Sequence, residues 1–553
     1  MVFLCAREDS NPEPPGPKPG TLSIELRARE YVYKIRILCG KVKSVCEMAA
    51  CVFKLIYMRE AMRMPEKIKI PEKIEAPQEV LSIMNALKER GFSAYIVGGC
   101  LRDILLQRDP KDWDIATDAK PEQIQELFTD SVYENEFGTV GVKTESENKA
   151  LKIIEVTTFR TEGEYSDKRH PDAVEFTDSI EQDLARRDFT INAMAWDGAH
   201  FVDPFGGQKD LGEGIIRTVG DPDRRFSEDA LRLMRAVRFS SDLSFVIENG
   251  TSEAMRKNAG LLEFVAKERI GDEFRRLVMT PSPDAGIETM RELKMLKHVL
   301  PELEEGWDVE QNKHHIFTVW EHNIRALRYT VEQKYPLEVR MAALLHDVGK
   351  PRAKRGSGPD ATFWGHEVVG GRLAAEALER LHFSKKEIEK IALLVRSHMF
   401  QYDPDIVTDA SVRRLIAKVG AENMKELIQV READRVGSGV KKAVPYRLRH
   451  FMFKIEKLLT ESVSRKDMKI DGVVLMNTLG VAPGPRVGAI LEALFEEILD
   501  EPGKNDTEYL VRRAHELNEL SDTELAALRQ QAKEKYEAVL REEEEAIKSK
   551  YQV

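Results

Sequence analysis

The spacing of apolar residues changes near residue 208, and this change divides the chain into two parts. Before it, helical spacing predicts helices over residues 79–90 and 121–128, and short apolar runs predict strands over residues 94–97, 113–116, 139–142 and 153–158. After it, helical spacing continues to the end, with Pro/Gly breaks at residues 281–283, 356–359 and 483–485. The pattern predicts an α+β protein, in which a small mixed α/β head precedes a long helical part.

The most informative stretch begins where the predicted strand 94–97 ends, at Gly98 and Gly99. These glycines would let backbone N–H groups approach an anion at a helix start. Asp112 and Asp114 follow at the beginning of the next apolar run. Alternate residues of a strand face the same side, so the two carboxylates would lie together, an arrangement that suits Mg²⁺. Metal-assisted phosphoryl transfer is the expected chemistry, and a glycine turn beside a surface Asp-x-Asp is the alternative.

Two further groups in the head could complete such a site. Glu155 lies on the predicted strand 153–158 and could supply a third carboxylate, although an ordinary strand glutamate would have the same pattern. Arg187 and its neighbour Arg186 offer fork-shaped donors to phosphate, and Asp188 and Asn192 could hydrogen-bond a ribose. The alternative is a helix start capped by Asp188, which is compatible with phosphate binding.

The stretch 203–207 (DPFGG) predicts a tight turn that ends the head and sets the direction of the next helix. Beyond it, Arg232, Arg235 and Arg238 recur every third residue after Asp229. On a helix, Asp229, Arg232 and Arg235 would lie along one face. An Asp only accepts and an Arg only donates, so the pair would match cytosine and adenine and reject uracil and guanine. Surface ion pairs are the alternative explanation of this spacing.

A second candidate site lies in the helical part. Six potential ligands occur on successive helical segments: His322, His346, Asp347, His366, His398 and Asp434. Together they could bind a pair of transition-metal ions with open positions for water and phosphate, whereas any one of these histidines could instead be a buried core residue. Lys350 could contact a substrate phosphate, and His314 and His315 are secondary because their spacing is poor. The strings LLHDVGKP, GHEVVGG and RSHMF resemble the HD phosphohydrolase domain.

Composition narrows the class of protein. A chain of 553 residues implies about three or four domains, and 42% apolar with 32% charged residues is typical of soluble proteins. The net charge of −11 argues against uniform coating by nucleic acid but allows a local basic groove. Four of the five cysteines precede residue 52, so no disulfide framework is expected, and no apolar run reaches membrane-spanning length. We expect a cytoplasmic protein without membrane contact, preceded at residues 1–63 by a non-native extension or an N-terminal arm.

The motifs GGCLRD, DWDIAT, RRDFTINA, DPFGG and EDALRLMRAVRF occur in this order and precede Glu268-Arg269-Ile270. Together they resemble the class II transfer-RNA nucleotidyltransferases, the CCA-adding enzymes and their poly(A) polymerase relatives. The resemblance implies a polymerase-β-like head at residues 64–207 and an all-α neck at 208–300 that binds nucleotide and RNA. An HD domain would follow at 301–455 and a helical tail at 456–553.

The resemblance also implies residue roles. Asp112 and Asp114 would bind Mg²⁺, and a divalent transition metal would occupy the HD site. Nucleotide contacts would fall on Gly99, Arg102, Arg187, Asp229, Arg232, Arg235 and Arg238. Residues 161–175 (TEGEYSDKRHPDAVE) resemble the flexible loop that lets the full enzymes add A after CC.

The expected reaction is template-independent addition of C and A to the transfer-RNA 3′ end from CTP and ATP. Poly(A) synthesis and CC-only or A-only addition remain alternatives, as does a metal phosphohydrolase whose head only binds RNA. Lys441, Lys442, Arg447 and Arg449 could line a surface for transfer RNA near the tail, and the acidic run 542–545 is expected to be a solvated face. The oligomeric state and the HD substrate are left open.

Overall fold

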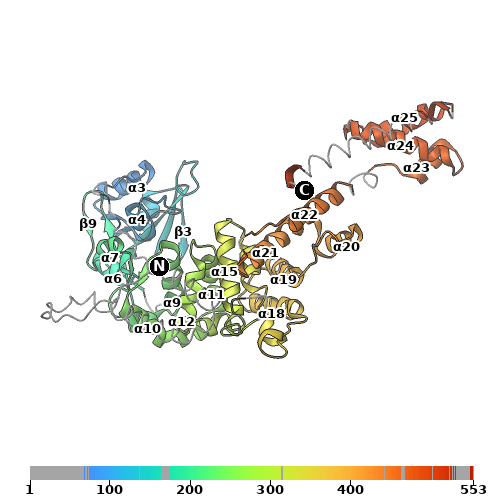
Figure 1. The fold of residues 1–553 in the computed structure, drawn as a ribbon. Helices are drawn as coiled ribbons and strands as arrows, with labels where there is room; N and C mark the ends of the chain where they lie inside the picture. Colours follow the sequence, from blue (N-terminus) through green and yellow to red (C-terminus); the bar gives the residue numbers. More distant parts are fainter. Residues whose placement is uncertain are drawn as a thin grey trace, which may run out of the picture. The chain divides into compact units, whose positions relative to one another are not determined.

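The computed structural model describes residues 74–135, 138–163, 174–312, 316–440, 442–461, 468–500 and 502–521, with a few single residues and short pieces outside these ranges. The chain forms two compact units. The first contains the chain up to Trp320 together with Ser357–Ala361 and Glu376–Lys385, and the second contains the remainder. Figure 1 colours the head blue to teal and the helical parts green to red.

The head is built on a seven-stranded mixed sheet in the order β3-β4-β5-β2-β1-β8-β9. The strands are β1 (Ala94–Val97), β2 (Asp114–Thr117), β3 (Ser131–Asn135), β4 (Thr139–Lys143), β5 (Ile153–Thr158), β8 (Ala195–Trp196) and β9 (Phe201–Val202). Only β2 and β5 pair in parallel within this sheet. A separate hairpin, β6 (Arg160–Glu162) with β7 (Val174–Phe176), forms the base of the loop expected at residues 161–175. The loop itself lies outside the described residues between 163 and 174.

Helices of the head pack through apolar faces at helical spacing. In α3 (Gln78–Glu89), Val80, Ile83, Met84 and Leu87 are buried, which is the period-3.6 stripe expected of a surface helix. The other head helices are α4 (Gly98–Leu105), α5 (Pro121–Leu127), α6 (Ile180–Ala185) and α7 (Gly207–Glu213), with the 3₁₀ turn η1 (Thr190–Asn192). Asp203 accepts hydrogen bonds from the N–H groups of Gly207 and Gln208 at 2.7 and 3.0 Å, and Gly206 has φ +72°. The DPFGG stretch is therefore the tight turn that the sequence predicts.

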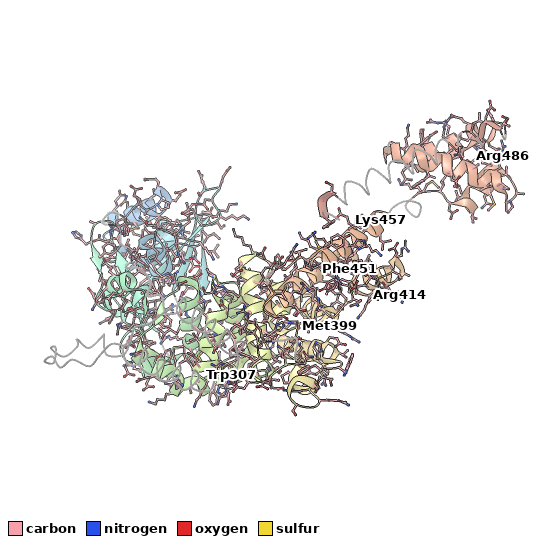
Figure 2. All side chains as sticks on the ribbon, in the orientation of Figure 1. Trp307, Met399, Arg414, Phe451, Lys457 and Arg486 are labelled. Atoms are coloured by element: carbon pink, nitrogen blue, oxygen red, sulfur yellow. The ribbon has the colours of Figure 1, made fainter. Side chains whose placement is uncertain are left out.

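The first unit continues as a helical neck. Its helices are α8 (Pro222–Glu228), α9 (Leu231–Leu243), α10 (Asn249–Asn258), α11 (Lys267–Val278), α12 (Pro283–Glu292), α13 (Leu296–Val299) and α14 (Pro301–Glu304), with η2 (Ala259–Phe264) between α10 and α11. A two-residue parallel pair, β10 (Ile215–Ile216) with β11 (Val246–Ile247), ties the start of the neck to the end of α9. Trp307, labelled in Figure 2, packs edge-on against Trp320 and lies 3.4 Å from the guanidinium carbon of Arg291.

The described residues of the second unit form helices and connecting loops, and their β-type pairing is the isolated bridge Arg355–Thr362. Its helices include α15 (Val319–Glu332), α16 (Leu337–Leu345), α17 (Lys350–Ala353), α18 (His366–Arg380), α19 (Lys385–Ser397), α20 (Asp409–Val419), α21 (Met424–Gly437) and α22 (Tyr446–Glu461). The short helix η4 (Ala421–Asn423) lies in the loop before α21, whereas η3 (Gly358–Asp360), the start of α15, the end of α18 and Lys385 belong to the first unit. Phe451 of α22, which is labelled in Figure 2, stacks on Phe400 with ring centroids 5.1 Å apart.

The last part has a core of its own. It comprises α23 (Gly472–Leu479), α24 (Pro485–Asp500), η5 (Pro502–Lys504) and α25 (Thr507–Asn518), and the buried residues include Leu475, Ile490, Leu494 and Leu510. Arg486 donates to the carbonyl oxygens of Asn518 and Leu520, each at 2.7 Å, which fixes the end of α25 against α24 (Figure 2). Among the described helices, none combines the length and the apolar character that a bilayer crossing requires.

Candidate active site and metal centre

The end of β1 brings the groups of the first motif together. Strand β1 ends at Val97, and α4 begins at Gly98 with φ +72°. A Cβ on Gly98 would lie 3.1 Å from Nη1 of Arg187 and 3.3 Å from Oδ2 of Asp114. Glycine is required here because the backbone is left-handed and a guanidinium and a carboxylate converge on the space that a side chain would take.

The two motif aspartates do not lie on the same strand. Strand β2 begins at Asp114, whereas Asp112 lies in the bend before it, so the expectation of two carboxylates alternating along one strand was wrong. The physical reason is that the ladder with β5 starts at Trp113, whose carbonyl accepts from the N–H of Glu155 at 3.0 Å and whose side chain is buried. Asp114 itself pairs in register with Glu155.

The electrostatics of Asp114 nevertheless fit a cation site. Burial raises the pKa of Asp114, the Arg187 guanidinium lowers it and the neighbouring Asp112 carboxylate raises it, and the result is about 6. A half-buried carboxylate with a second carboxylate close enough to repel it is stabilised by a divalent cation. Asp112 is exposed, so a metal held by both groups would face solvent and substrate.

Three residues expected to contact nucleotide form a chain of hydrogen bonds with one another. Arg102 makes an ion pair with Asp103 at 2.7 Å and donates to Oδ1 of Asn192 at 2.9 Å. Asn192 in turn donates to Oδ1 of Asp188 at 3.2 Å. All three side chains are buried. The network connects α4, which contains Arg102, to η1, which contains Asn192.

Asp188 also connects the head to the neck. Its Oδ2 accepts from Nε of Arg235 on α9 at 2.7 Å and lies 2.6 Å from Nη2. Burial alone would raise the pKa of Asp188, but the Arg235 guanidinium outweighs it and the pKa falls to about 2. The ring of Phe239 lies 5.1, 5.3 and 4.3 Å from the guanidinium carbons of Arg102, Arg235 and Arg238, and Arg238 also pairs with Glu273 at 2.5 Å.

Sequence reasoning did not include Asp183, which binds both arginines of the RRD segment. Its side chain is 1% exposed and pairs with Arg186 at 2.8 Å and with Arg187 at 3.0 Å. The sequence contained a signal for these ion pairs, because Asp183 lies three positions before Arg186 and four before Arg187. Residues with these spacings face each other on a helix, and α6 ends at Ala185, directly before the two arginines.

Asp229 and Arg232 lie next to the RRD segment but not on one helix. Asp229 has extended dihedrals and ends α8, and α9 begins only at Leu231, whose N–H donates to Asp229. The prediction of one helical face for Asp229, Arg232 and Arg235 was therefore wrong, because the Asp229 carboxylate is used at the junction of two helices. Nη2 of Arg232 donates to the carbonyl oxygen of Arg186 at 3.2 Å, which links this junction to the residue before Arg187.

Both members of the predicted base-reading pair have partners of opposite charge. Asp229 accepts from Nη2 of Arg269 at 2.9 Å, and Arg232 pairs with Glu228 at 2.7 Å. Arg269 belongs to the Glu268-Arg269-Ile270 motif, so this ion pair joins that motif to Asp229 of the EDALRLMRAVRF motif.

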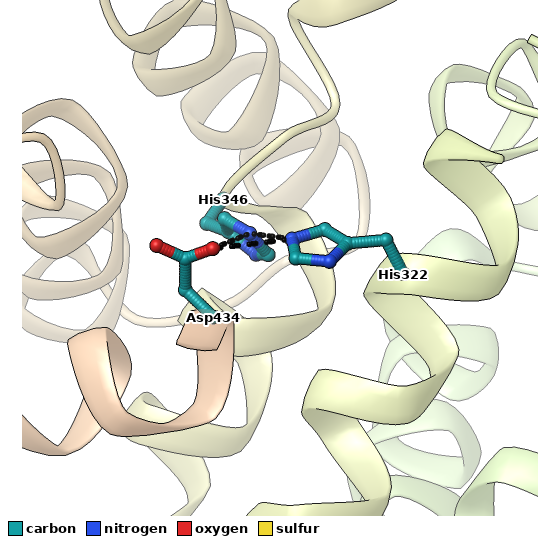
Figure 3. Close-up of side chains that lie close together, drawn as sticks. All are labelled: His322, His346 and Asp434. Carbon is teal, nitrogen blue, oxygen red and sulfur yellow. Dashed lines mark hydrogen bonds and ion pairs between the residues drawn. The ribbon is translucent and has the colours of Figure 1, made fainter. Parts of the chain in front are cut away.

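The six expected ligands of the second unit come together in two groups of three. In the first group, Nε2 of His322 lies 2.8 Å from Nε2 of His346 and 3.3 Å from Oδ1 of Asp434. Figure 3 shows the three side chains converging, His322 from α15, Asp434 from α21 and His346 from the turn that follows α16. In the second group, Nε2 of His366 lies 3.4 Å from Nε2 of His398 and 3.3 Å from Oδ1 of Asp347. All six are buried, and the potential ligand atoms of each group lie within 4.8 Å of one another.

Asp347 connects the two groups. Its Oδ1 faces His366, whereas its Oδ2 lies 3.2 Å from Nε2 of His322 and 2.5 Å from Nζ of Lys350. A carboxylate with one oxygen toward each cluster could supply a ligand atom to both groups. Lys350 therefore touches a predicted ligand of the metal centre, in addition to its predicted role toward phosphate.

The histidines are oriented by backbone carbonyl groups. Nδ1 of His346, His366 and His398 lies 2.8, 2.8 and 2.7 Å from the carbonyl oxygens of the residues three positions earlier. A carbonyl only accepts, so each Nδ1 carries a proton and each Nε2 points into the cluster, which is the orientation of most metal-binding histidines.

The charges of the cluster also favour a cation. Burial disfavours the charged form of His346 and so lowers its pKa. The carboxylates of Asp347 and Asp434 outweigh this effect and raise the pKa of His346 to about 10. Burial lowers the pKa of His398 to about 3. Despite burial, Lys350 lowers the pKa of Asp347 and Arg431 lowers that of Asp434. The residues present therefore fit a transition-metal pair.

Some predictions fall outside the described residues. These are residues 1–63, His314, His315, Lys441, most of the loop at 161–175 and the acidic run 542–545. Of the basic residues near the tail, Arg447 pairs with Asp403 at 2.6 Å and Arg449 donates to the carbonyl oxygen of Tyr551 at 2.8 Å.

Three family models match successive parts of the chain. The poly A polymerase head domain matches residues 94–217, a probable RNA and SrmB-binding site of polymerase A matches residues 244–306, and the HD domain matches residues 319–438. A CCA-adding enzyme of Ligilactobacillus salivarius is 34% identical over 445 residues, which cover 80% of this chain and 96% of that protein. The chain belongs to the CCA-adding enzyme family of transfer-RNA nucleotidyltransferases.

Relatives within this family differ in activity. An A-adding transfer-RNA nucleotidyltransferase of Deinococcus radiodurans is 37% identical over 339 residues, which cover 59% of this chain and 76% of that protein. The crystal structure of the Bacillus stearothermophilus CCA-adding enzyme in complex with CTP superposes with a TM-score of 0.54 at 27% identity, over 80% of this chain and 98% of that one. The expected fold, a nucleotidyltransferase head followed by a helical neck and an HD domain, is confirmed.

Proposed function

We propose that this chain adds C and A to the 3′ end of transfer RNA from CTP and ATP without a nucleic-acid template. The observation that carries this proposal is the convergence of Asp114 and Arg187 at Gly98, with Asp112 close enough to repel Asp114. A carboxylate pair for a metal thus lies beside a guanidinium for phosphate. The similarity to a full CCA-adding enzyme over 96% of its length supports the same reaction here.

In the proposed reaction, the 3′-hydroxyl oxygen of the RNA bonds to the α-phosphorus, its proton is lost and pyrophosphate leaves. Asp112 and Asp114 would hold Mg²⁺, and Glu155, opposite Asp114, would support them. Magnesium bound there would neutralise charge on the attacking hydroxyl and on the triphosphate. Arg187 and the N–H groups at Gly98 and Gly99 would bind the triphosphate.

We propose that Asp229 and Arg232 select the base, with Asp229 accepting from its amino group and Arg232 donating to its ring nitrogen. The contact of Arg232 with the backbone of Arg186 supports a position near the triphosphate. In this structure Arg269 binds Asp229, and Glu228 binds Arg232. Binding of a base would therefore replace some of these ion-pair contacts with contacts to the base. Uracil and guanine would leave buried polar groups unpaired, and this penalty excludes them.

The remaining assignments follow from the same scheme. The head, proposed at residues 64–207, would perform the transfer, and the neck, at 208–300, would carry base selection. Arg102, Asp188 and Asn192 would act within the hydrogen-bond network that joins α4, and with it Gly99, to the neck. Arg235 and Arg238 would complete the group of arginine side chains around the ring of Phe239. The tail at 456–553 would support the body of the transfer RNA.

A second candidate activity is hydrolysis of a phosphate ester by the HD domain at residues 301–455. Two buried groups of ligands joined by Asp347 support this activity, because a metal pair can bind both a water and a phosphate. A transition metal is proposed because histidine supplies four of the six ligands.

The decisive experiment incubates the purified chain with end-trimmed transfer RNA and each nucleotide separately, and resolves the products at single-base length. Addition of CC from CTP followed by a single A from ATP is expected. A long A tail without C would indicate a poly(A) polymerase, and CC alone or A alone would indicate a specialist. The phosphohydrolase alternative predicts no nucleotide addition by the wild-type chain. Asp114→Asn is expected to abolish addition, and addition that survives this change would contradict the assignment of the head.

A further inference from the structure

The buried carboxylate of Asp183 holds Arg187 by one edge of its guanidinium. Oδ2 of Asp183 accepts from Nε of Arg187 at 3.3 Å and from Nη2 at 3.0 Å. The other oxygen, Oδ1, accepts from Nε and Nη2 of Arg186 at 2.9 and 2.8 Å. A carboxylate that accepts four charge-assisted hydrogen bonds at 1% exposure is firmly fixed, so the orientation of Arg187 is fixed with it.

This contact determines what the third guanidinium nitrogen faces. With Nε and Nη2 turned to Asp183, Nη1 points to Gly98. It lies 3.1 Å from the position of a Cβ there, and Oδ2 of Asp114 lies 3.3 Å from the same position. A guanidinium so close to a metal-binding carboxylate would pair with it, and so compete with the cation, unless another anion held it.

We propose that Asp183 is a positioning residue, the counter-charge that keeps Arg187 from pairing with Asp114. Asp114 then stays available to a divalent cation, and Nη1 of Arg187 stays available to the triphosphate. The inference deepens the proposed function and depends on it for the roles of Asp114 and Arg187. Asp183 is not proposed to touch substrate or metal, because it acts through Arg187.

The test measures Mn²⁺ binding by electron paramagnetic resonance in the full chain. The parent protein carries His346→Ala and Asp347→Ala, which remove one ligand from each group of the second metal centre. Asp183→Asn is expected to weaken Mn²⁺ binding about tenfold, the size typical of losing a residue that orients a ligand. Adding Arg187→Gln to Asp183→Asn is expected to restore Mn²⁺ affinity to the parent value, because the competing cation is gone, while CTP binding stays weak. A merely structural role of Asp183 would give no such rescue.

A matched control removes another buried carboxylate of the same unit. Glu302 is buried and makes a bidentate pair with Arg380 at 2.9 Å for each bond, so Glu302→Gln removes an equivalent ion pair. Its Mn²⁺ affinity should equal that of the parent. A folded Asp183→Asn chain with parental Mn²⁺ affinity, or a double variant without rescue, would overturn the proposal.

If Asp183→Asn does not fold, Arg187→Gln alone provides the test. It should bind Mn²⁺ at least as tightly as the parent and bind CTP more weakly, and a loss of Mn²⁺ binding would contradict the proposal. The Mn²⁺ measurement needs no transfer RNA. A wild-type chain that adds no nucleotide would therefore refute the proposed function, whereas an unchanged Mn²⁺ affinity refutes the role of Asp183.

Discussion

Asp114, the first residue of β2, lies directly opposite Glu155 of the parallel strand β5. Residues opposite each other in paired strands direct their side chains to the same face of the sheet. The two carboxylates therefore share one face, although they are 41 positions apart in the chain, and Asp112 approaches the same place from the preceding bend.

This arrangement predicts a graded effect of removing the carboxylates. Asp114→Asn should lower nucleotide addition by about 10³-fold or more, because a metal contributes several kcal/mol to charge stabilisation. Glu155→Gln should lower it by about 10- to 100-fold, as expected of a supporting ligand. Single-turnover addition of CTP to trimmed transfer RNA measures both. The exposed Glu145→Gln is the control and should retain full activity, and equal losses in all three variants would contradict the assignment.

Base selection should depend on Asp229. Asp229→Ala removes the acceptor for the base amino group, so kcat/KM for CTP and ATP should fall by about 10- to 100-fold. The preference for these nucleotides over UTP and GTP should narrow at the same time, because a missing acceptor costs the correct bases most. Lys257→Ala, at a residue that is 70% exposed in the neck, should change neither value. Loss of activity with selectivity intact would show that Asp229 matters only for the junction of α8 and α9.

The second metal centre should be separable from nucleotide addition. His346→Ala combined with Asp347→Ala removes a ligand from each group, so transition metal measured by elemental analysis of the purified protein should fall to background. Addition of C and A should continue at the wild-type rate, since these ligands belong to the other unit. His515→Ala in α25 controls for the loss of a histidine and should keep the metal. Unchanged metal content in the double variant would exclude these residues as ligands.

The ion pair between Asp188 and Arg235 should make stability depend on pH in the acid range. The pKa of Asp188 is about 2 in the folded chain and about 4 when unfolded. The pair therefore contributes about 2 kcal/mol, present above pH 4 and lost as the pH falls toward 2. The difference in unfolding free energy between wild type and Asp188→Asn should shrink from pH 6 to pH 3, as followed by tryptophan fluorescence in urea. A pH-independent difference would mean that the pair contributes no charge-dependent stability.

Much of the head could be predicted because its evidence is local. The strands at β1 and β5 and the helix α3 follow from apolar spacing within one segment, and the turn at 203–207 follows from Asp, Pro and Gly at fixed positions. The strands β8 and β9 are two residues each and are held by their neighbours, so they have too few positions to show a period.

By itself, the amino-acid sequence determined the kinds of side chain available and their order, and hence the family, the carboxylates of the head and the six candidate ligands of the second unit. Tertiary structure alone decided which of these groups meet and which neighbour neutralises each one. Arg235 holds Asp188 across 47 positions, and Arg269 holds Asp229 across 40 positions. The physical reason is that a charge is fixed by its nearest buried partner, and contacts between distant segments exist only once the chain is folded.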